Sequence, residues 1–171
     1  MVTIEWYVLR TICGKEEAAL TLLRKRFAGI ELIYPRRRIS WRKQGTIISL
    51  VRPLFEGYLF VAYPQEKIGE FDYLLRRCDL KLVWLVYSTG TLIPILEEEK
   101  CIIQQLIGKD GIVEGSTVEN HDGQLQVIKG PLAGLGHIVK KVSRRNRRIT
   151  VEIPVLDEKK NIELEGIFKD G

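Results

Sequence analysis

The sequence predicts an α+β protein in two parts, a mixed domain of strands and helices followed by a small all-β module. Up to residue 107, strand-like alternation and helix-like spacing of apolar residues follow each other, whereas only short β-like segments follow residue 117. A polar stretch with three glycines, residues 108–116, predicts a linker between them. With 171 residues, 45% of them hydrophobic, the chain can bury one or two small cores.

The first predicted elements are a strand, a helix and a second strand. Residues 3–9 alternate and are rich in β-branched and aromatic side chains, which favours a strand. Residues 16–27 carry apolar side chains at helical spacing, with two glutamates in the first turn, where they suit the positive end of the helix dipole. Residues 30–34 form a second short strand, which Pro35 ends.

A basic segment follows and predicts a projecting hairpin or an ordered loop. Residues 36–43 are basic, Gln44 and Gly45 form a turn, and residues 46–51 return as an apolar run. Guanidinium groups beside an aromatic ring are typical of sites for single-stranded nucleic acid, although the tryptophan equally suits packing over the sheet. The candidates for DNA contact are Arg36, Arg37, Arg38, Trp41, Arg42 and Lys43.

The next elements complete the first domain. The near-continuous apolar run at residues 54–63 predicts a central strand buried on both faces. A helix at 68–75, a strand at 82–86 and a helix at 97–107 follow. The order of strand, helix, strand, strand, helix, strand is typical of a ferredoxin-like split βαβ sandwich, so we expect an antiparallel sheet with its helices on one face.

Beyond the linker, the sequence predicts a small β-barrel. Its β-like runs lie at residues 124–128, 136–142, 149–155 and 161–164, separated by glycine, proline or charged turns. Gly130 and Pro131 start a tight turn, and we expect Gly134 and Gly136 to adopt conformations or close approaches that a Cβ atom would prevent.

Charge gives the first indication of function. There are 27 Lys and Arg against 22 Asp and Glu, a net charge of +5. The excess is concentrated at residues 140–148, which hold six bases and no acid. Crowded like charges repel each other, so this turn favours a polyanionic partner, and the alternative is an ordinary solvated turn.

Several classes of protein are not favoured. The N-terminal sequence does not resemble a signal peptide, and no segment approaches the length of a membrane span, so we expect a cytoplasmic protein without membrane contact. Cys13, Cys78 and Cys101 are too far apart for a typical disulfide framework or zinc site. His121 and His137 have no neighbours that suggest catalysis. We therefore expect that the protein is not an enzyme and that it binds no metal and no cofactor.

Three motifs in order resemble those of the NusG family. Residues 6–17, WYVLRTICGKEE, and 54–61, LFEGYLFV, resemble the two signatures of its N-terminal domain, and residues 126–140, QVIKGPLAGLGHIVK, resemble a KOW motif. The resemblance implies a monomeric transcription elongation factor. It would comprise an RNA polymerase-binding domain at 1–107, a linker at 108–116 and a KOW domain, a small β-barrel, at 117–171.

The resemblance also implies where RNA polymerase binds. In the family, an apolar depression around the first and central strands accepts the tip of the polymerase clamp helices. Alternation along the first strand assigns Trp6 to packing and turns Tyr7 to the opposite face. The contact candidates are Tyr7, Leu54, Phe55 and Tyr58. Glu56 stands where the family commonly has proline, which removes a rigid turn and adds a negative charge.

The basic turn is similar to the specialised paralogues, most of all the LoaP group of processive antiterminators, whose KOW domain binds a hairpin in nascent RNA. An RNA stem presents phosphates at high density and rewards each neutralising contact by counterion release. The candidates for RNA contact are Lys129, His137, Lys140, Lys141, Arg144, Arg145, Asn146, Arg147 and Arg148.

Other readings of the resemblance stay open. A housekeeping factor would use the KOW domain to bind Rho or a small-subunit ribosomal protein. A ribosome-associated RNA-binding protein is a second alternative, since KOW motifs also occur in ribosomal proteins. In the family, the basic hairpin lies near the upstream edge of the transcription bubble, which allows contact with non-template DNA.

Overall fold

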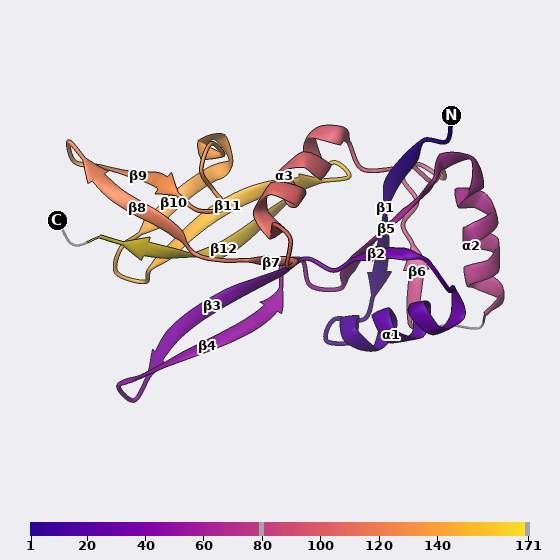
Figure 1. The fold of residues 1–171 in the computed structure, drawn as a ribbon, viewed down its shortest axis with the longest axis horizontal. Helices are drawn as coiled ribbons and strands as arrows, with labels where there is room; N and C mark the ends of the chain where they lie inside the picture. Colours follow the sequence, from indigo (N-terminus) through magenta and orange to yellow (C-terminus); the bar gives the residue numbers. More distant parts are fainter. Residues whose placement is uncertain (79–80, 170–171) are drawn as a thin grey trace. The chain divides into compact units, whose positions relative to one another are not determined.

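The computed structural model describes residues 1–78 and 81–169, which form two compact units (Figure 1). The first unit consists of Met1–Tyr34 and Phe55–Glu97, and the second of Pro35–Leu54 and Glu98–Gly171. The basic hairpin and nearly all of the third helix therefore belong to the second unit, together with the C-terminal strands. The domain boundaries expected from the sequence stay a prediction, and residues 170–171 of the expected KOW domain lie outside the described residues.

The first unit is built on a four-stranded sheet. Its strands are β1 (Ile4–Thr11), β2 (Glu31–Ile33), β5 (Tyr58–Pro64) and β6 (Val83–Leu85), in the order β2-β5-β1-β6. All neighbouring strands pair antiparallel. This order and this pairing are those expected of a split βαβ unit.

Two helices and a short 3₁₀ turn complete the first unit. They are α1 (Glu16–Arg26), α2 (Ile68–Arg77) and η1 (Gln65–Lys67). Side chains of both helices share one buried cluster with one face of the sheet; its members include Tyr7, Leu9, Leu23, Phe71 and Val83. Both helices therefore cover the same face, as the sequence predicts. Acidic residues in the first turn of α1 and basic residues in its last turn match the helix dipole.

The central strand is shorter than the sequence predicts. Strand β5 begins at Tyr58, and residues 54–57 form a turn in which the Tyr58 N–H donates to the Phe55 carbonyl oxygen at 3.1 Å. Gly57 has φ +76°, in the left-handed region, which a strand cannot continue through. Apolar composition alone does not reveal this change of direction.

The second unit contains the hairpin that the basic segment predicts. Strand β3 (Arg36–Lys43) pairs antiparallel with β4 (Thr46–Pro53), and β7 (Ile112–Val113) adds a parallel strand on the other side of β3. Gln44 and Gly45 form the two-residue turn, both with positive φ, as a tight hairpin requires. Strand β7 lies inside the stretch that the sequence predicts as linker.

The second unit also contains a five-stranded sheet with the order β10-β11-β12-β8-β9. Its strands are β8 (Ser116–His121), β9 (Gln124–Lys129), β10 (Val139–Ser143), β11 (Arg148–Val155) and β12 (Glu158–Phe168). Strand β11 alternates strictly, and Ile149, Val151 and Ile153 are fully buried. Strand β12 pairs antiparallel with β11 and parallel with β8.

Helix α3 (Glu97–Ile107) lies where the sequence predicts it and is bonded to loops of the second unit. The Gln105 side-chain amide donates to the carbonyl oxygens of Pro131 and Ala133 at 3.1 and 2.8 Å. The buried Glu99 carboxylate accepts the Leu156 N–H at 2.9 Å. These bonds explain why the helix belongs to the second unit.

The glycines after β9 differ in what they do. Gly130 has φ +108°, and a Cβ atom there would lie 2.8 Å from the Ser116 Cα, so only glycine fits. Gly134 also has positive φ. The expectation for Gly136 is wrong: it begins the 3₁₀ turn η2 (Gly136–Ile138), lacks a positive φ and has open space where a Cβ would point. The strand predicted from residue 136 starts only at residue 139.

Within residues 1–78 and 81–169, no helix combines the length and apolar character needed to cross a bilayer.

Candidate nucleic-acid interface

The turn between β10 and β11, residues 144–147, carries three arginines, and Arg148 follows at the start of β11. The Asn146 N–H donates to the Ser143 Oγ at 3.3 Å, and the Arg147 N–H donates to the Arg144 carbonyl oxygen at 3.3 Å. The Arg147 carbonyl oxygen accepts the Gly166 N–H of β12 at 3.0 Å. The turn is therefore an ordered loop tied to the sheet, and Arg144, Arg145, Asn146 and Arg147 are all exposed.

Arg148 differs from the other arginines of the turn. Its side chain is half-buried, and Nη2 donates to the Ser40 carbonyl oxygen of β3 at 2.6 Å, while Nη1 donates to the Arg147 carbonyl oxygen at 3.2 Å. A guanidinium bound to backbone carbonyls has fewer N–H groups left for a phosphate. Arg148 therefore links the turn to the hairpin.

The remaining RNA candidates lie away from this turn or are partly engaged. Lys129 at the end of β9 and His137 in η2 are exposed, and neither lines the groove that residues 145–148 form with the hairpin. Lys140 and Lys141 are exposed on β10, where Lys140 Nζ lies 3.2 Å from a carboxylate oxygen of Glu152. The predicted RNA-contact residues thus comprise one compact turn, residues 144–147, and several residues outside it.

The DNA candidates of the hairpin fall into two groups. Near the base of the hairpin, Arg37 donates to the Glu163 carbonyl oxygen and Arg38 pairs with the Glu114 carboxylate at 2.9 Å, while Arg36 is half-buried. Toward the hairpin turn, Arg42 and Lys43 are exposed. Arg37 and Arg38 are thus bonded within the second unit, whereas Arg42 and Lys43 are the more exposed group.

Trp41 is half-buried and lies beside Arg52 of β4, whose guanidinium carbon is 5.7 Å from the centre of the indole ring. That distance is within reach of a cation–π contact. From the sequence, Trp41 could either stack on a nucleic-acid base or pack over the sheet. Arg52 was missed, although it is a basic residue on the return strand and pairs in register with Arg37.

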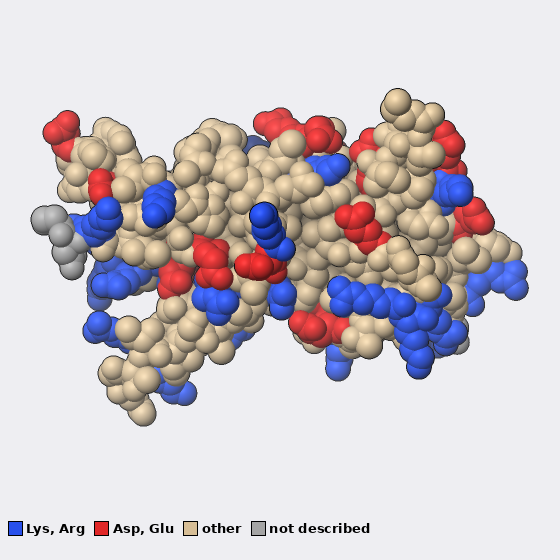
Figure 2. All heavy atoms as spheres, viewed as in Figure 1, with Lys and Arg blue, Asp and Glu red and all other residues tan. Residues whose placement is uncertain are grey.

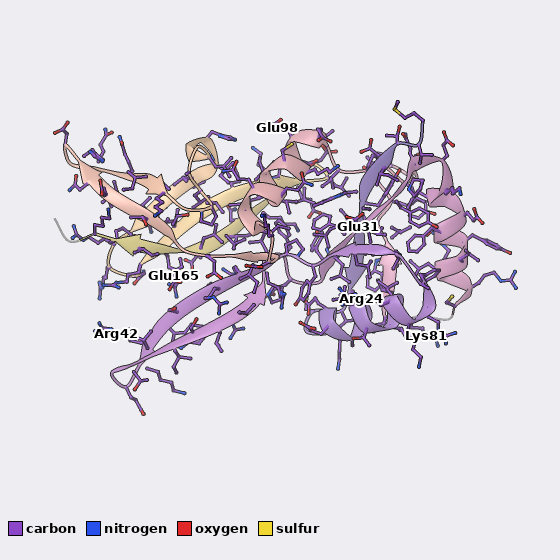
Figure 3. The ribbon with its side chains drawn as sticks, viewed as in Figure 1. Arg24, Glu31, Arg42, Lys81, Glu98 and Glu165 are labelled. Carbon is purple, nitrogen blue, oxygen red and sulfur yellow. The ribbon has the colours of Figure 1, made fainter. Side chains whose placement is uncertain are left out.

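A groove within the second unit brings the hairpin and the basic turn together. Its volume is about 580 Å³. Its walls are Ser40, Trp41, Arg42 and Ile47 from the hairpin, and Arg145, Asn146, Arg147, Arg148 and Glu165 from the strands and turn opposite. Figure 2 shows Lys and Arg side chains on this side of the second unit, and Figure 3 labels Arg42 on β3 and Glu165 on β12.

The charge of the groove is strongly positive. Four arginines and one glutamate line it, a formal net charge of +3. The Glu165 Oε1 accepts the Ser40 N–H at 3.2 Å, so this carboxylate also holds the hairpin. Sequence reasoning missed Ser40 and Glu165, since no local pattern indicates that residues more than a hundred positions apart will meet.

The polymerase candidates are all buried. Their exposed fractions are 2% for Tyr7, 3% for Leu54, 4% for Phe55 and 8% for Tyr58. Tyr7 belongs to the core under the two helices, where burial and, to a smaller extent, Glu5 raise the pKa of its phenol above the ordinary value. Trp6 is also buried, with its ring centre 5.8 Å from that of Phe60. Alternation thus assigns the two side chains to opposite faces, and both side chains are buried.

A buried carboxylate fixes the turn that precedes β5. Glu16, only 3% exposed in the first turn of α1, accepts the Gly57 N–H at 2.8 Å. A Cβ atom on Gly57 would lie 2.9 Å from the Thr11 carbonyl oxygen, so the position needs glycine. Glu56, the neighbouring residue, is exposed. Sequence reasoning interpreted Glu16 only as a helix-dipole residue.

Phe55 of this turn packs edge-to-face against two aromatic side chains of β5. The Phe55 ring centre lies 6.1 Å from those of both Tyr58 and Phe60, at steep interplanar angles typical of edge-to-face packing. The Arg10 guanidinium lies 4.4 Å from the centre of the Tyr58 ring. The cluster is therefore a well-packed part of the first unit.

Comparisons with known proteins agree with the fold. The family model described as "Transcription termination factor nusG" matches residues 4–119. The chain is 23% identical to the transcription termination/antitermination protein NusG of Thermus thermophilus and 22% identical to that of Deinococcus radiodurans, over 95% of this chain and 96% of each relative. The solved structure of Thermotoga maritima NusG superposes with a TM-score of 0.61 at 20% identity, covering 95% of this chain and 94% of the other. The chain belongs to the NusG family of transcription termination and antitermination factors.

Proposed function

We propose that this chain is a cytoplasmic, monomeric elongation factor that binds RNA polymerase and promotes processive antitermination, with a KOW domain that binds a hairpin in nascent RNA. The proposal divides the chain as the sequence suggests, into a ferredoxin-like polymerase-binding domain at 1–107, a linker at 108–116 and a KOW barrel at 117–171. In this proposal the protein catalyses no reaction and uses no cofactor.

The observation that carries the RNA part is the exposed basic turn. Arg144, Arg145 and Arg147 project from an ordered loop whose backbone is hydrogen-bonded to Ser143 and to β12. An ordered loop presents its charges at little conformational cost on binding, and each phosphate neutralised releases counterions. A protein partner would gain less from so many cations in one turn.

Sequencing of RNA crosslinked to the protein in its native cell tests this part. We expect the reads to concentrate on a stem-loop in the leader of few transcripts, and the R144A/R145A/R147A variant to lose this enrichment. The matched control is R24A/K25A/R26A, which removes three exposed charges from the last turn of α1. Reads spread evenly over all transcripts would contradict hairpin recognition.

The polymerase part rests on the family and on the aromatic cluster at the start of β5. Replacing Phe55 and Tyr58 together by Leu keeps apolar volume in the core and removes both rings. We expect polymerase affinity to fall by about 2 kcal/mol or more, the range of aromatic hot spots. Unfolding curves establish that the variant is folded, and unchanged affinity of the folded variant would move the contact elsewhere.

A housekeeping termination or coupling factor is the alternative function. Both relatives, at 22–23% identity, are named termination/antitermination proteins. In that alternative, the KOW domain binds Rho or a small-subunit ribosomal protein, and the basic turn is incidental. Capture of Rho or ribosomal subunits by the purified chain, unaffected by the R144A/R145A/R147A substitutions, would favour it over RNA recognition.

A further inference from the structure

The groove between the hairpin and the basic turn is formed by two regions that lie about a hundred residues apart in the sequence. Trp41 and Arg42 come from β3, whereas Arg145, Asn146 and Arg147 come from the turn between β10 and β11. All belong to the second unit. We propose that this groove holds an unpaired strand of RNA that adjoins the stem bound by the basic turn. The proposal rests on the proposed function and deepens it.

The size of the groove favours single-stranded RNA over a stem. A volume of about 580 Å³ is that of a small-ligand site, far too small to enclose a double helix. Unpaired nucleotides can place their bases in such a space while their phosphates stay at the rim. Sequence-specific recognition of RNA is commonly of this kind, since unpaired bases expose edges and faces that a stem hides.

The side chains supply the three interactions that an unpaired strand needs. The indole of Trp41 lines the groove and offers a stacking surface for a base. Arg42, Arg145 and Arg147 are exposed and offer charge to phosphates. The exposed amide of Asn146 has both a donor and an acceptor for a base edge.

The walls are fixed to each other before any RNA binds. Arg148 Nη2 donates to the Ser40 carbonyl oxygen at 2.6 Å, and the Ser40 N–H donates to Glu165 Oε1 at 3.2 Å. Both backbone groups of Ser40 are thus bonded to the opposite wall, directly beside Trp41. A preformed groove lowers the ordering cost of binding.

The test uses the full chain and three labelled probes: a blunt RNA duplex, the same duplex with an unpaired extension, and the extended duplex made of DNA. We expect the wild-type protein to bind the extended RNA more tightly than the blunt one. Trp41→Ala is expected to lower affinity for the extended RNA by about 5- to 150-fold, the loss of one stacked base, and to leave affinity for the blunt duplex unchanged. Trp41→Phe retains most of the affinity because a phenyl ring still stacks.

The matched control is Trp84→Ala, which removes a tryptophan that is 47% exposed and lies in the first unit, outside the groove. Trp41→Leu, which keeps apolar bulk but cannot stack a base, replaces the alanine variant if that variant fails to fold. Equal losses on blunt and extended RNA, or no loss on either, would overturn the assignment. Tighter binding of the extended DNA would also overturn it and assign the groove to a DNA strand.

The same titrations separate this proposal from the proposed function. If R144A/R145A/R147A weakens binding to all RNA probes but Trp41→Ala does not, the basic turn binds RNA and only the groove assignment fails. If the wild-type chain binds none of the RNA probes, RNA recognition fails as a whole.

Discussion

The turn at residues 54–57 before β5 and the turn at residues 144–147 between β10 and β11 each contain a residue with positive φ, Gly57 and Arg147. The first turn is held by a buried charge from α1: the Glu16 carboxylate accepts the Gly57 N–H inside the first unit, whereas Glu56 within the turn is exposed. In the second turn, three arginines are exposed, and its own hydrogen bonds are long, at 3.3 Å. The Glu16 carboxylate is thus bonded within the fold, whereas the arginines of the second turn are exposed at the surface.

The largest effect should come from the buried turn. Replacing Phe55 by Ala removes a ring that is 4% exposed and packs against Tyr58 and Phe60. We expect the free energy of unfolding to fall by about 3–5 kcal/mol, the usual cost of deleting a buried phenyl ring. Denaturation in urea measures it, and a loss below about 1 kcal/mol would show that the aromatic cluster is not part of the stable core.

A smaller but more specific effect should follow from Glu16→Ala. The variant leaves the Gly57 N–H without its acceptor in a buried site, which costs about 1–3 kcal/mol of unfolding free energy. Glu17→Ala is the matched control, because Glu17 lies in the same helical turn and is exposed. It should change stability by no more than about 0.5 kcal/mol. Equal losses in both variants would mean that the helix dipole, not the buried bond, accounts for the effect.

The basic turn should behave in the opposite way. Removing the side chains of Arg144, Arg145 and Arg147 should change the free energy of unfolding by less than about 0.5 kcal/mol, since exposed side chains away from the core rarely contribute more. The measurement is the same urea denaturation. A loss of 2 kcal/mol or more would show that these arginines support the fold, and the contrast between the two turns would disappear.

The smallest effect concerns the ionisation of Tyr7. Burial raises the pKa of its phenol, so the folded protein holds this proton to higher pH than the unfolded chain, whose tyrosines ionise near pH 10. Stability therefore falls as pH rises above about 10. An ultraviolet titration of the wild type minus that of Tyr7→Phe isolates the group. Ionisation of Tyr7 below pH 10 would contradict its burial.

Local patterns in the sequence predicted much of the first unit and of the hairpin. Alternation at β1, helical spacing at α1 and α2, and the Gln44–Gly45 turn each depend on neighbouring residues, and the structure contains all of them. The change of direction at Gly57 and the helical turn at Gly136 were missed, because an apolar run and a glycine both allow several conformations.

Long-range contacts could not be predicted in the same way. The local composition of the sequence identified two basic regions, the hairpin that contains Trp41 and the turn that contains the arginines of residues 144–148. The bonds that join them through Ser40 span more than a hundred residues, and no local periodicity encodes such a meeting. The apolar run at residues 54–63 did predict burial, and Phe55 and Tyr58 are buried. The resemblance also assigned both as contact candidates, since it indicates which residues match a motif but not how deeply they lie.

The salt dependence of RNA binding tests the central claim most directly. The wild-type chain and the R144A/R145A/R147A variant are titrated with a leader stem-loop and with a scrambled stem at several salt concentrations. Each lost phosphate contact removes about 0.7–0.9 from the slope of log affinity against log salt, so the variant should bind more weakly with a flatter slope. The wild type should prefer the stem-loop. Equal slopes for the two proteins, or equal wild-type affinity for both RNAs, would contradict RNA recognition by the basic turn.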